Sequence, residues 1–145
     1  MELSLNELLE AMNGELIVKG KTDFNSVCID TRKIEKNNIY FAINGERFNG
    51  NKFVIEAFSK GASIAIVDEI LFDLNNTDNL QTVIKVEDTE KALLNLANYY
   101  RKKLGLKVIG VTGSCGKTST KDLIAAFLSE KYKVFKTKGN FNNQI

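Results

Sequence analysis

The chain has 145 residues, of which 43% are hydrophobic and 26% charged, and its formal net charge is +2. This composition is typical of a soluble globular protein, and the length allows one ordinary domain or a small domain with part of another. The small net charge does not favour nucleic acid as a partner, and no apolar run approaches the roughly 20 residues of a membrane-spanning helix. The first residues, MELSLNELLE, are acidic and unlike a signal peptide, so we expect a cytoplasmic protein that binds neither nucleic acid nor membrane.

The sequence contains no histidine and only two cysteines, Cys28 and Cys115. Two thiols do not complete a four-ligand zinc site, and the lack of histidine excludes histidine-based acid–base catalysis within this chain. A disulfide between the two cysteines is not expected in a reducing compartment.

Helix caps and apolar spacing predict the elements of the first half. Ser4 and Glu7 fit a capping box at the start of a helix that runs through Met12 and stops at Gly14. Short β-like pieces follow, and a polar loop over 44–52 precedes a helix that ends at Gly61. The predicted strands span residues 15–18, 26–29, 39–43, 63–67 and 82–86.

In the second half, Asp88 or Thr89 caps a long helix that extends to about Leu104. The apolar face of this helix is predicted to contain Leu93, Leu96, Ala97 and Tyr100. Strands are then expected at 107–111 and 133–136, with a helix over 117–130 between them. This alternation predicts an α/β fold with a parallel sheet at least in the second half. We expect a domain boundary near 86–88, which gives domains 1–86 and 87–145.

Residues 108–120 read VIGVTGSCGKTST, an apolar strand followed by a glycine-rich turn and the start of a helix. Gly113 and Gly116 allow backbone amides to converge on an anion, while Lys117 reaches the terminal phosphates and the hydroxyl of Thr118 binds magnesium. The pattern is a variant of the usual phosphate-binding loop, because Val111 occupies the first glycine position. The predicted ATP and Mg²⁺ site comprises Thr112, Gly113, Ser114, Cys115, Gly116, Lys117, Thr118 and Ser119. The alternative for the loop is a Gly/Ser-rich turn that binds no ligand. Cys115 is expected to be a small residue that the loop tolerates, and the alternative is a reactive thiol.

Several segments, in the order found here, resemble the Mur ligase family. These are SVCIDTR at 26–32, IYFAI at 39–43, GERFNG at 45–50, TGSCGKTSTKD at 112–122 and KGNFNNQI at 138–145. The resemblance covers essentially the whole chain. It implies a small N-terminal uridine-binding α/β domain followed by the first part of a P-loop parallel-sheet ATPase domain.

The resemblance also implies an activity, an ATP-dependent ligation in peptidoglycan precursor synthesis. ATP phosphorylates a peptide carboxylate to an acyl phosphate, which an amine then attacks. The GNFNN and GERF segments favour the member that adds D-alanyl-D-alanine to UDP-N-acetylmuramoyl-tripeptide over a sister ligase that adds the third peptide residue. A stand-alone module that binds a UDP-linked precursor without catalysis is the alternative from another class.

Site residues follow from the resemblance position by position. Lys117 would hold the β- and γ-phosphates as the catalytic lysine, and Thr118 would hold the metal. The substrate-binding residues would be Asp30, Thr31 and Arg32 at the uridine site, Asn44, Gly45 and Arg47 in the following loop, and Asn140, Asn142 and Asn143 near the reaction centre. The family often has D-G-H-x-F where this chain has NGNKF at 49–53, so a charge-dependent role is not expected of Asn49 and Asn51.

Few residues follow Thr118 in this sequence. The resemblance places the remaining metal ligands, the adenine pocket and the dipeptide-binding domain beyond Ile145, so we expect the chain alone to be an incomplete enzyme that turns over no ATP. An uncovered apolar helix face at Leu123, Ala126 and Phe127 would favour self-association.

Overall fold

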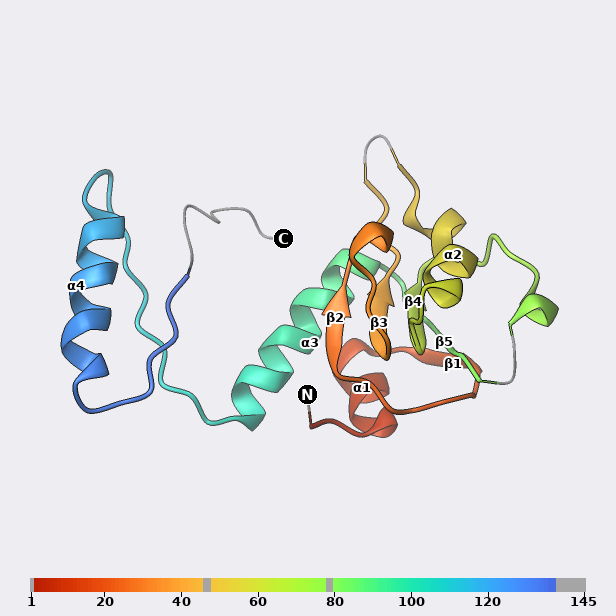
Figure 1. Cartoon of the computed structure of the whole chain (residues 1–145), viewed down its shortest axis with the longest axis horizontal. Coiled ribbons are helices and arrows are strands. Elements are labelled where there is room, and N and C mark those ends of the chain that lie inside the picture. The colour runs from red at the N-terminus through yellow and green to blue at the C-terminus, as the bar shows by residue number, and fades with distance from the viewer. Residues whose placement is uncertain (1, 46–47, 78–79, 138–145) are drawn as a thin grey trace. The chain divides into compact units, whose positions relative to one another are not determined.

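The computed structural model describes residues 2–45, 48–77 and 80–137. The chain divides into two compact units, Met1–Gly105 and Leu106–Ile145. The first unit contains, in order, α1 (Leu5–Met12), β1 (Glu15–Val18), β2 (Ser26–Cys28), η1 (Thr31–Lys33), β3 (Asn38–Phe41), η2 (Gly50–Phe53), α2 (Val54–Ser59), β4 (Ile64–Val67), η3 (Leu74–Asn76), β5 (Thr82–Lys85) and α3 (Thr89–Lys103) (Figure 1). The second unit contains α4 (Lys117–Ser129).

A five-stranded mixed sheet forms the centre of the first unit, with the strand order β1-β5-β4-β3-β2. Strands β2, β3, β4 and β5 are parallel to one another, and β1 pairs antiparallel with β5. Because the carboxyl ends of parallel strands meet at one edge of a sheet, the segments after β2, β3, β4 and β5 all leave from the same edge.

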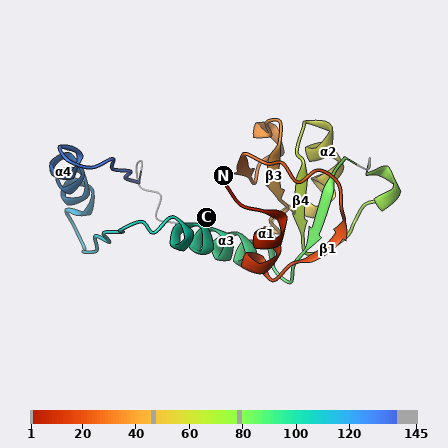
Figure 2. The ribbon, with the colours of Figure 1, turned by 90° about the horizontal axis from the view of Figure 1, so that it is seen from below.

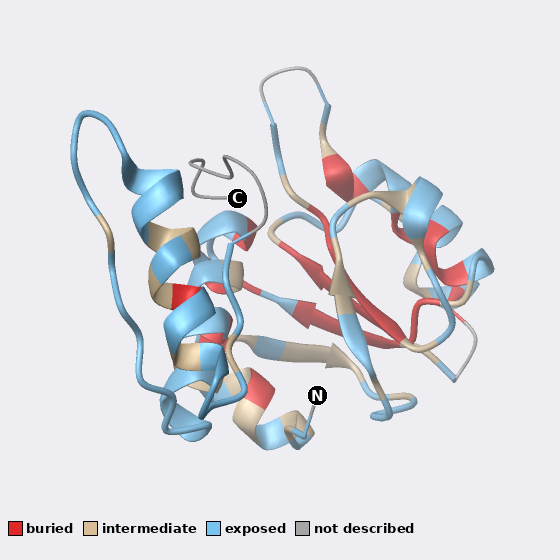
Figure 3. Ribbon diagram, turned by 60° about the vertical axis from the view of Figure 1, so that its left-hand side comes forward, coloured by how far each residue is buried: buried red, intermediate tan, exposed pale blue. Residues whose placement is uncertain are grey.

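Helices cover both faces of this sheet, which explains why its central strands are apolar on both sides. Helices α1 and α3 pack on the face presented by Ile39, Phe41 and Ile66, whereas α2 packs on the face presented by Tyr40 and Ala65. The two sets alternate along each strand, as the pleat requires. Figure 2 shows α1 and α2 on opposite sides of the sheet, and Figure 3 shows the buried strands between them. The predicted α/β class is confirmed.

Local capping signals fix the predicted helix starts. The Ser4 side chain accepts from the Glu7 amide and Glu7 accepts from the Ser4 amide, so the capping box is formed. Asp88, not Thr89, caps α3 and accepts from the Lys91 amide. Helix α1 ends at Met12, as predicted, and Asn13, directly before Gly14, adopts the left-handed conformation at its C-terminus.

The division between the units falls after Gly105, later than the boundary expected near 86–88. The reason is the packing of α3 against α1, which places Ala92 and Leu96 in the same core as α1. Ala97, expected on the apolar face, is instead exposed.

The second unit differs from the sequence expectation in its strands. Residues 107–111 and 133–136 form no strand, and the parallel sheet lies in the first unit. An apolar segment becomes a strand only when another strand supplies hydrogen bonds, and residues 106–137 contain no such neighbour. Apolar side chains there remain exposed, including Val108 at 64% and Phe135 at 87%.

On the expected apolar face of α4, Leu123 and Phe127 are 61% and 78% exposed. Across the three described stretches, no helix has both the length and the apolar character needed to cross a membrane.

Candidate functional site

The glycine-rich turn before α4 has the backbone geometry of an anion-binding loop. Gly113 and Gly116 have positive φ angles of 152° and 76°, which favour glycine. Gly116 is the N-cap of α4, and no side chain within the described stretches caps this helix. The first amides of a 13-residue helix therefore point toward the loop together with the positive end of the helix dipole.

Lys117 is the first residue of α4, and its side chain folds back over the loop. The ammonium group donates to the carbonyl oxygen of Gly113 at 2.5 Å. The loop, the helix amides and this ammonium together fit a nucleotide phosphate. Thr118 lies in the first turn and offers one oxygen ligand to a magnesium ion, whereas the described residues contain no cluster of three metal-ligating Cys, Asp or Glu side chains.

In the first unit, polar residues gather where the parallel strands end. Asp30 follows β2, Asn44 follows β3, Asp68 follows β4, and Glu87 and Asp88 follow β5. In sheets of this kind, ligands bind outside the carboxyl ends of the strands. The fold therefore brings Asp30 and Asn44, which are far apart in sequence, to the same edge.

The Asp30-Thr31-Arg32 segment is held as a rigid turn. Asp30 caps η1 by accepting from the Arg32 amide at 3.0 Å, and it accepts from Nε and Nη2 of Arg32 at 2.9 and 2.8 Å. The Arg32 guanidinium therefore holds the pKa of Asp30 below its usual value. The Arg32 side chain remains 84% exposed, so it stays accessible to a ligand.

Tyr40 on β3 holds the end of the loop that follows its own strand. Its buried hydroxyl donates to the carbonyl oxygen of Gly50 at 3.1 Å. Burial, together with the nearby carboxylates of Glu56 and Asp30, raises the pKa of Tyr40 to about 12. The phenol therefore stays a neutral hydrogen-bond donor at physiological pH.

The loop after β3 is anchored at its two ends. We call these ends the loop base, which consists of Asn44, Gly45, Phe48, Asn49 and Gly50. Asn44 and Asn49 form an isolated antiparallel bridge, and the Gly45 amide donates to the Phe48 carbonyl at 2.9 Å. The Gly50 amide donates to the carbonyl of Ile43 at 3.0 Å.

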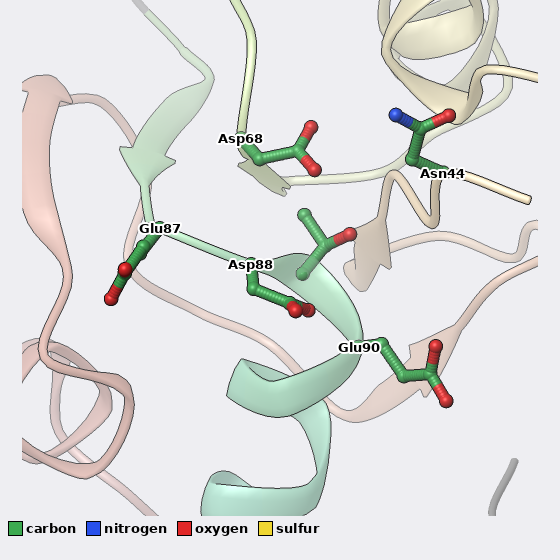
Figure 4. Close-up of a pocket in the computed structure, with 6 residues that line it drawn as sticks. Asn44, Asp68, Glu87, Asp88 and Glu90 are labelled. Carbon is green, nitrogen blue, oxygen red and sulfur yellow. The ribbon is translucent and has the colours of Figure 1, made fainter.

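A pocket of about 250 Å³ opens beside the loop base at the start of α3 (Figure 4). Its lining residues are Asn44, Asp68, Glu87, Asp88, Thr89 and Glu90. Four carboxylates line this pocket, and together they repel anionic groups such as a phosphate.

Of the predicted site residues, the structure brings Asp30, Thr31, Arg32, Asn44 and Gly45 to one sheet edge. It places the eight residues of the phosphate-binding loop together in the second unit. Arg47, Asn140, Asn142 and Asn143 lie outside the described residues.

Sequence reasoning missed Tyr40, Asn51 and Asp68. Tyr40 and Asp68 carried no signal that distinguishes them from a strand residue and a turn residue. Asn51 stood in a segment that departs from the family pattern, but only the tertiary contacts give it a role.

Two family models match this chain. The family described as "Mur ligase family, catalytic domain" matches residues 23–101, more than half of the chain, and "Mur ligase middle domain" matches residues 111–145. The chain belongs to the Mur ligase family. The resemblance inferred from the sequence motifs is therefore confirmed.

Curated Mur ligases are similar along most of the chain. The UDP-N-acetylmuramoyl-tripeptide–D-alanyl-D-alanine ligase of Bacillus subtilis (strain 168) is 46% identical over 125 residues, which are 86% of this chain and 27% of that protein. The UDP-N-acetylmuramoyl-L-alanyl-D-glutamate–2,6-diaminopimelate ligase of Clostridium tetani is 37% identical over 88% of this chain and 27% of its own length. The chain thus spans about a quarter of the length of these Mur ligases.

Solved Mur ligase structures share the fold. A crystal structure of MurF from Acinetobacter baumannii matches with a TM-score of 0.84 and 32% identity, covering 97% of this chain and 30% of that one. MurF ligase from Thermotoga maritima, solved in complex with ADP, matches with a TM-score of 0.66 and 34% identity, covering 80% of this chain and 26% of that one.

Proposed function

We propose that this chain carries the precursor-binding unit and the ATP phosphate-binding loop of a Mur ligase that adds D-alanyl-D-alanine to UDP-N-acetylmuramoyl-tripeptide. The observation that carries the proposal is the 46% identity with the Bacillus subtilis ligase of that name. The loop geometry around Gly113 and Gly116 supports the ATP part, and the polar sheet edge supports the precursor part. The reaction of the whole protein belongs to this proposal, as does a cytoplasmic location.

Under this proposal the second unit, from Leu106, begins the ATP-binding domain. The amides of residues 112–119 would surround the phosphates, Lys117 would neutralise the β- and γ-phosphates, and Thr118 would bind Mg²⁺. When bound, ATP would supply the phosphoryl group that turns the peptide carboxylate into an acyl phosphate. Lys117 needs no covalent chemistry for this role, because its contribution is positioning and charge.

The first unit would bind the uridine end of the precursor at the edge formed by the Asp30–Arg32 turn and the loop base. The turn offers an exposed guanidinium for the diphosphate, and the loop base offers amide groups for hydrogen bonds. By resemblance, Arg47 and the asparagines at 140, 142 and 143 would add contacts to the sugar nucleotide.

A second candidate function is the sister ligase reaction named for the Clostridium tetani relative, because that protein is also 37% identical to this chain. The two reactions use precursors that differ by one peptide residue. Isothermal titration with both UDP-linked precursors separates them only when the complete protein is used, since the peptide end lies far from the uridine end.

The two cysteines provide a direct test of the proposed function, because each lies at one proposed site. Cys28, whose thiol donates to the Asp30 carbonyl at 3.2 Å, reports on the precursor site, and the exposed Cys115 reports on the phosphate-binding loop. We expect UDP-N-acetylmuramoyl-tripeptide to slow iodoacetamide labelling of Cys28 only, and Mg–ATP to slow labelling of Cys115 only, as read by mass spectrometry.

The Lys117→Ala variant should abolish protection of Cys115 by ATP while leaving protection of Cys28 intact. Protection of Cys28 without protection of Cys115 would favour a precursor-binding module that does not use ATP. Labelling rates that neither ligand changes would contradict both assignments.

A further inference from the structure

We propose that Asn51 is a positioning residue that fixes the loop base against the end of β4 through its buried side-chain amide. The inference rests on the proposed function, since it concerns the loop expected to contact the UDP-linked precursor. Asn51 lies in η2, directly after the loop base, and its side chain is completely buried.

The Asn51 amide joins two segments that are distant in sequence. Its Nδ2 donates to Oδ1 of Asn49 at 2.9 Å and to Oδ1 of Asp68 at 2.5 Å. Its Oδ1 accepts from the backbone amide of Glu69 at 3.5 Å. A second link runs in parallel, because Nδ2 of Asn49 donates to Oε2 of Glu69 at 3.1 Å. The loop base is thereby tied to the residues that follow β4.

An amide side chain satisfies all of these neighbours. Two acceptor oxygens, from Asn49 and Asp68, face the Nδ2 group, and one backbone donor faces the Oδ1 group. Only a side chain with both a donor and an acceptor satisfies all three in a buried position, where an unpaired polar group is costly. A carboxylate at this position would offer the Asp68 carboxylate no N–H donor and would bring a second acidic group against it.

Asn51 itself does not line the pocket, whereas two groups it positions do. Asp68 accepts a hydrogen bond directly from Asn51. Asn44 forms a backbone bridge with Asn49, which is the other acceptor of the Asn51 amide. Loss of the Asn51 amide would therefore release the loop base from the end of β4 without removing any group that the proposed function assigns to the precursor.

The test compares precursor affinity with stability in the 145-residue chain. The Asn51→Asp variant should bind UDP-N-acetylmuramoyl-tripeptide at least about tenfold more weakly by calorimetry at 10 °C, well below its unfolding temperature, because a buried donor is replaced by a second carboxylate. Adding Asp68→Asn should restore much of the lost affinity, because the swap returns one amide and one carboxylate to the pair. The exposed Asn95→Ala variant of α3 is the control and should bind within about twofold of the unchanged protein.

Each outcome distinguishes this proposal from the proposed function. If the unchanged chain binds no precursor, the proposed function fails. If it binds and Asn51→Asp lowers only the unfolding temperature, Asn51 is structural and the positioning role is refuted. If Asn51→Asp does not fold, the Asn49→Ala variant replaces it, because it removes one acceptor of the Asn51 amide and leaves the bond to Asp68. An unchanged affinity of Asn49→Ala for the precursor would also refute the proposal.

Discussion

Replacing Gly50 with alanine should destabilise the first unit, because the loop base leaves no room for a methyl group there. A Cβ built on Gly50 lies 2.6 Å from the carbonyl carbon of Ala42 and 2.6 Å from the carbonyl oxygen of Ile43. Both atoms belong to the backbone at the end of β3. That backbone is held by the hydrogen bond from Ala42 to Ile66 at 2.9 Å, so it does not move freely.

The size of the effect follows from these contacts. Relief of the clash requires Gly50 to retreat by about an ångström, and overpacking of this kind costs about 1–3 kcal/mol. The retreat also stretches the Gly50 to Ile43 and Tyr40 to Gly50 hydrogen bonds, each worth about 0.5–1.5 kcal/mol. Because a stretched hydrogen bond keeps part of its strength, we expect a total loss of about 2–4 kcal/mol. For a unit of this size, that loss lowers the unfolding temperature by roughly 10–25 °C.

Thermal unfolding followed by circular dichroism measures this change. Gly45→Ala is the matched control in the same loop base, because its Cβ would meet only the Phe48 carbonyl oxygen at the ordinary distance of 3.8 Å. Gly45→Ala should unfold close to the unchanged protein. If Gly50→Ala and Gly45→Ala unfold at the same temperature, the steric argument for Gly50 is refuted.

Three further predictions concern the rest of the chain. A hydrogen bond from Lys103 lowers the pKa of Glu7 from 4.5 to about 2, so the stability that Glu7 contributes is complete above pH 4.5 and is lost as the pH falls toward 2. The unfolding temperature of Glu7→Gln should therefore fall less over that pH range than the unfolding temperature of the unchanged protein. An identical fall would contradict the role of this hydrogen bond. Leu96→Ala should lower the free energy of unfolding in urea by about 2–5 kcal/mol, because Leu96 is only 2% exposed. Leu94→Ala is the control and should lower it far less, because Leu94 is 39% exposed. Equal losses in the two variants would argue against α3 as part of the first unit. Phe127 is 78% exposed on α4, so Phe127→Ser should reduce any self-association seen by analytical ultracentrifugation, and an unchanged mass distribution would exclude this face as the contact.

Local signals in the sequence predicted the helices well. The Ser4–Glu7 capping box, the Asp88 cap and the start of α4 at Lys117 all depend on hydrogen bonds between residues three or four positions apart. Such bonds form within the segment that encodes them. The predicted strands of the first unit were also found, although their ends shift by one or two residues.

Strand pairing could not be predicted from the sequence in the same way. The sequence predicted strands at 107–111 and 133–136 and a parallel sheet at least in the second half, but the parallel strands found among the described residues lie in the first unit. A strand depends on a neighbour that is remote in sequence, so apolar character alone does not establish one. The antiparallel pairing of β1 with β5 and the packing of α3 on α1 likewise depend on contacts across most of the first unit.

The sequence by itself determined the family and predicted the phosphate-binding loop, because both depend on contiguous segments of the chain. Glycines at 113 and 116 followed by Lys117 specify a loop whose geometry is local to α4. Only the tertiary structure decided that Asp30 and Asn44 share a sheet edge and that Asn51 joins the loop base to Asp68. Those contacts close long loops between parallel strands, and no short stretch of sequence contains both partners.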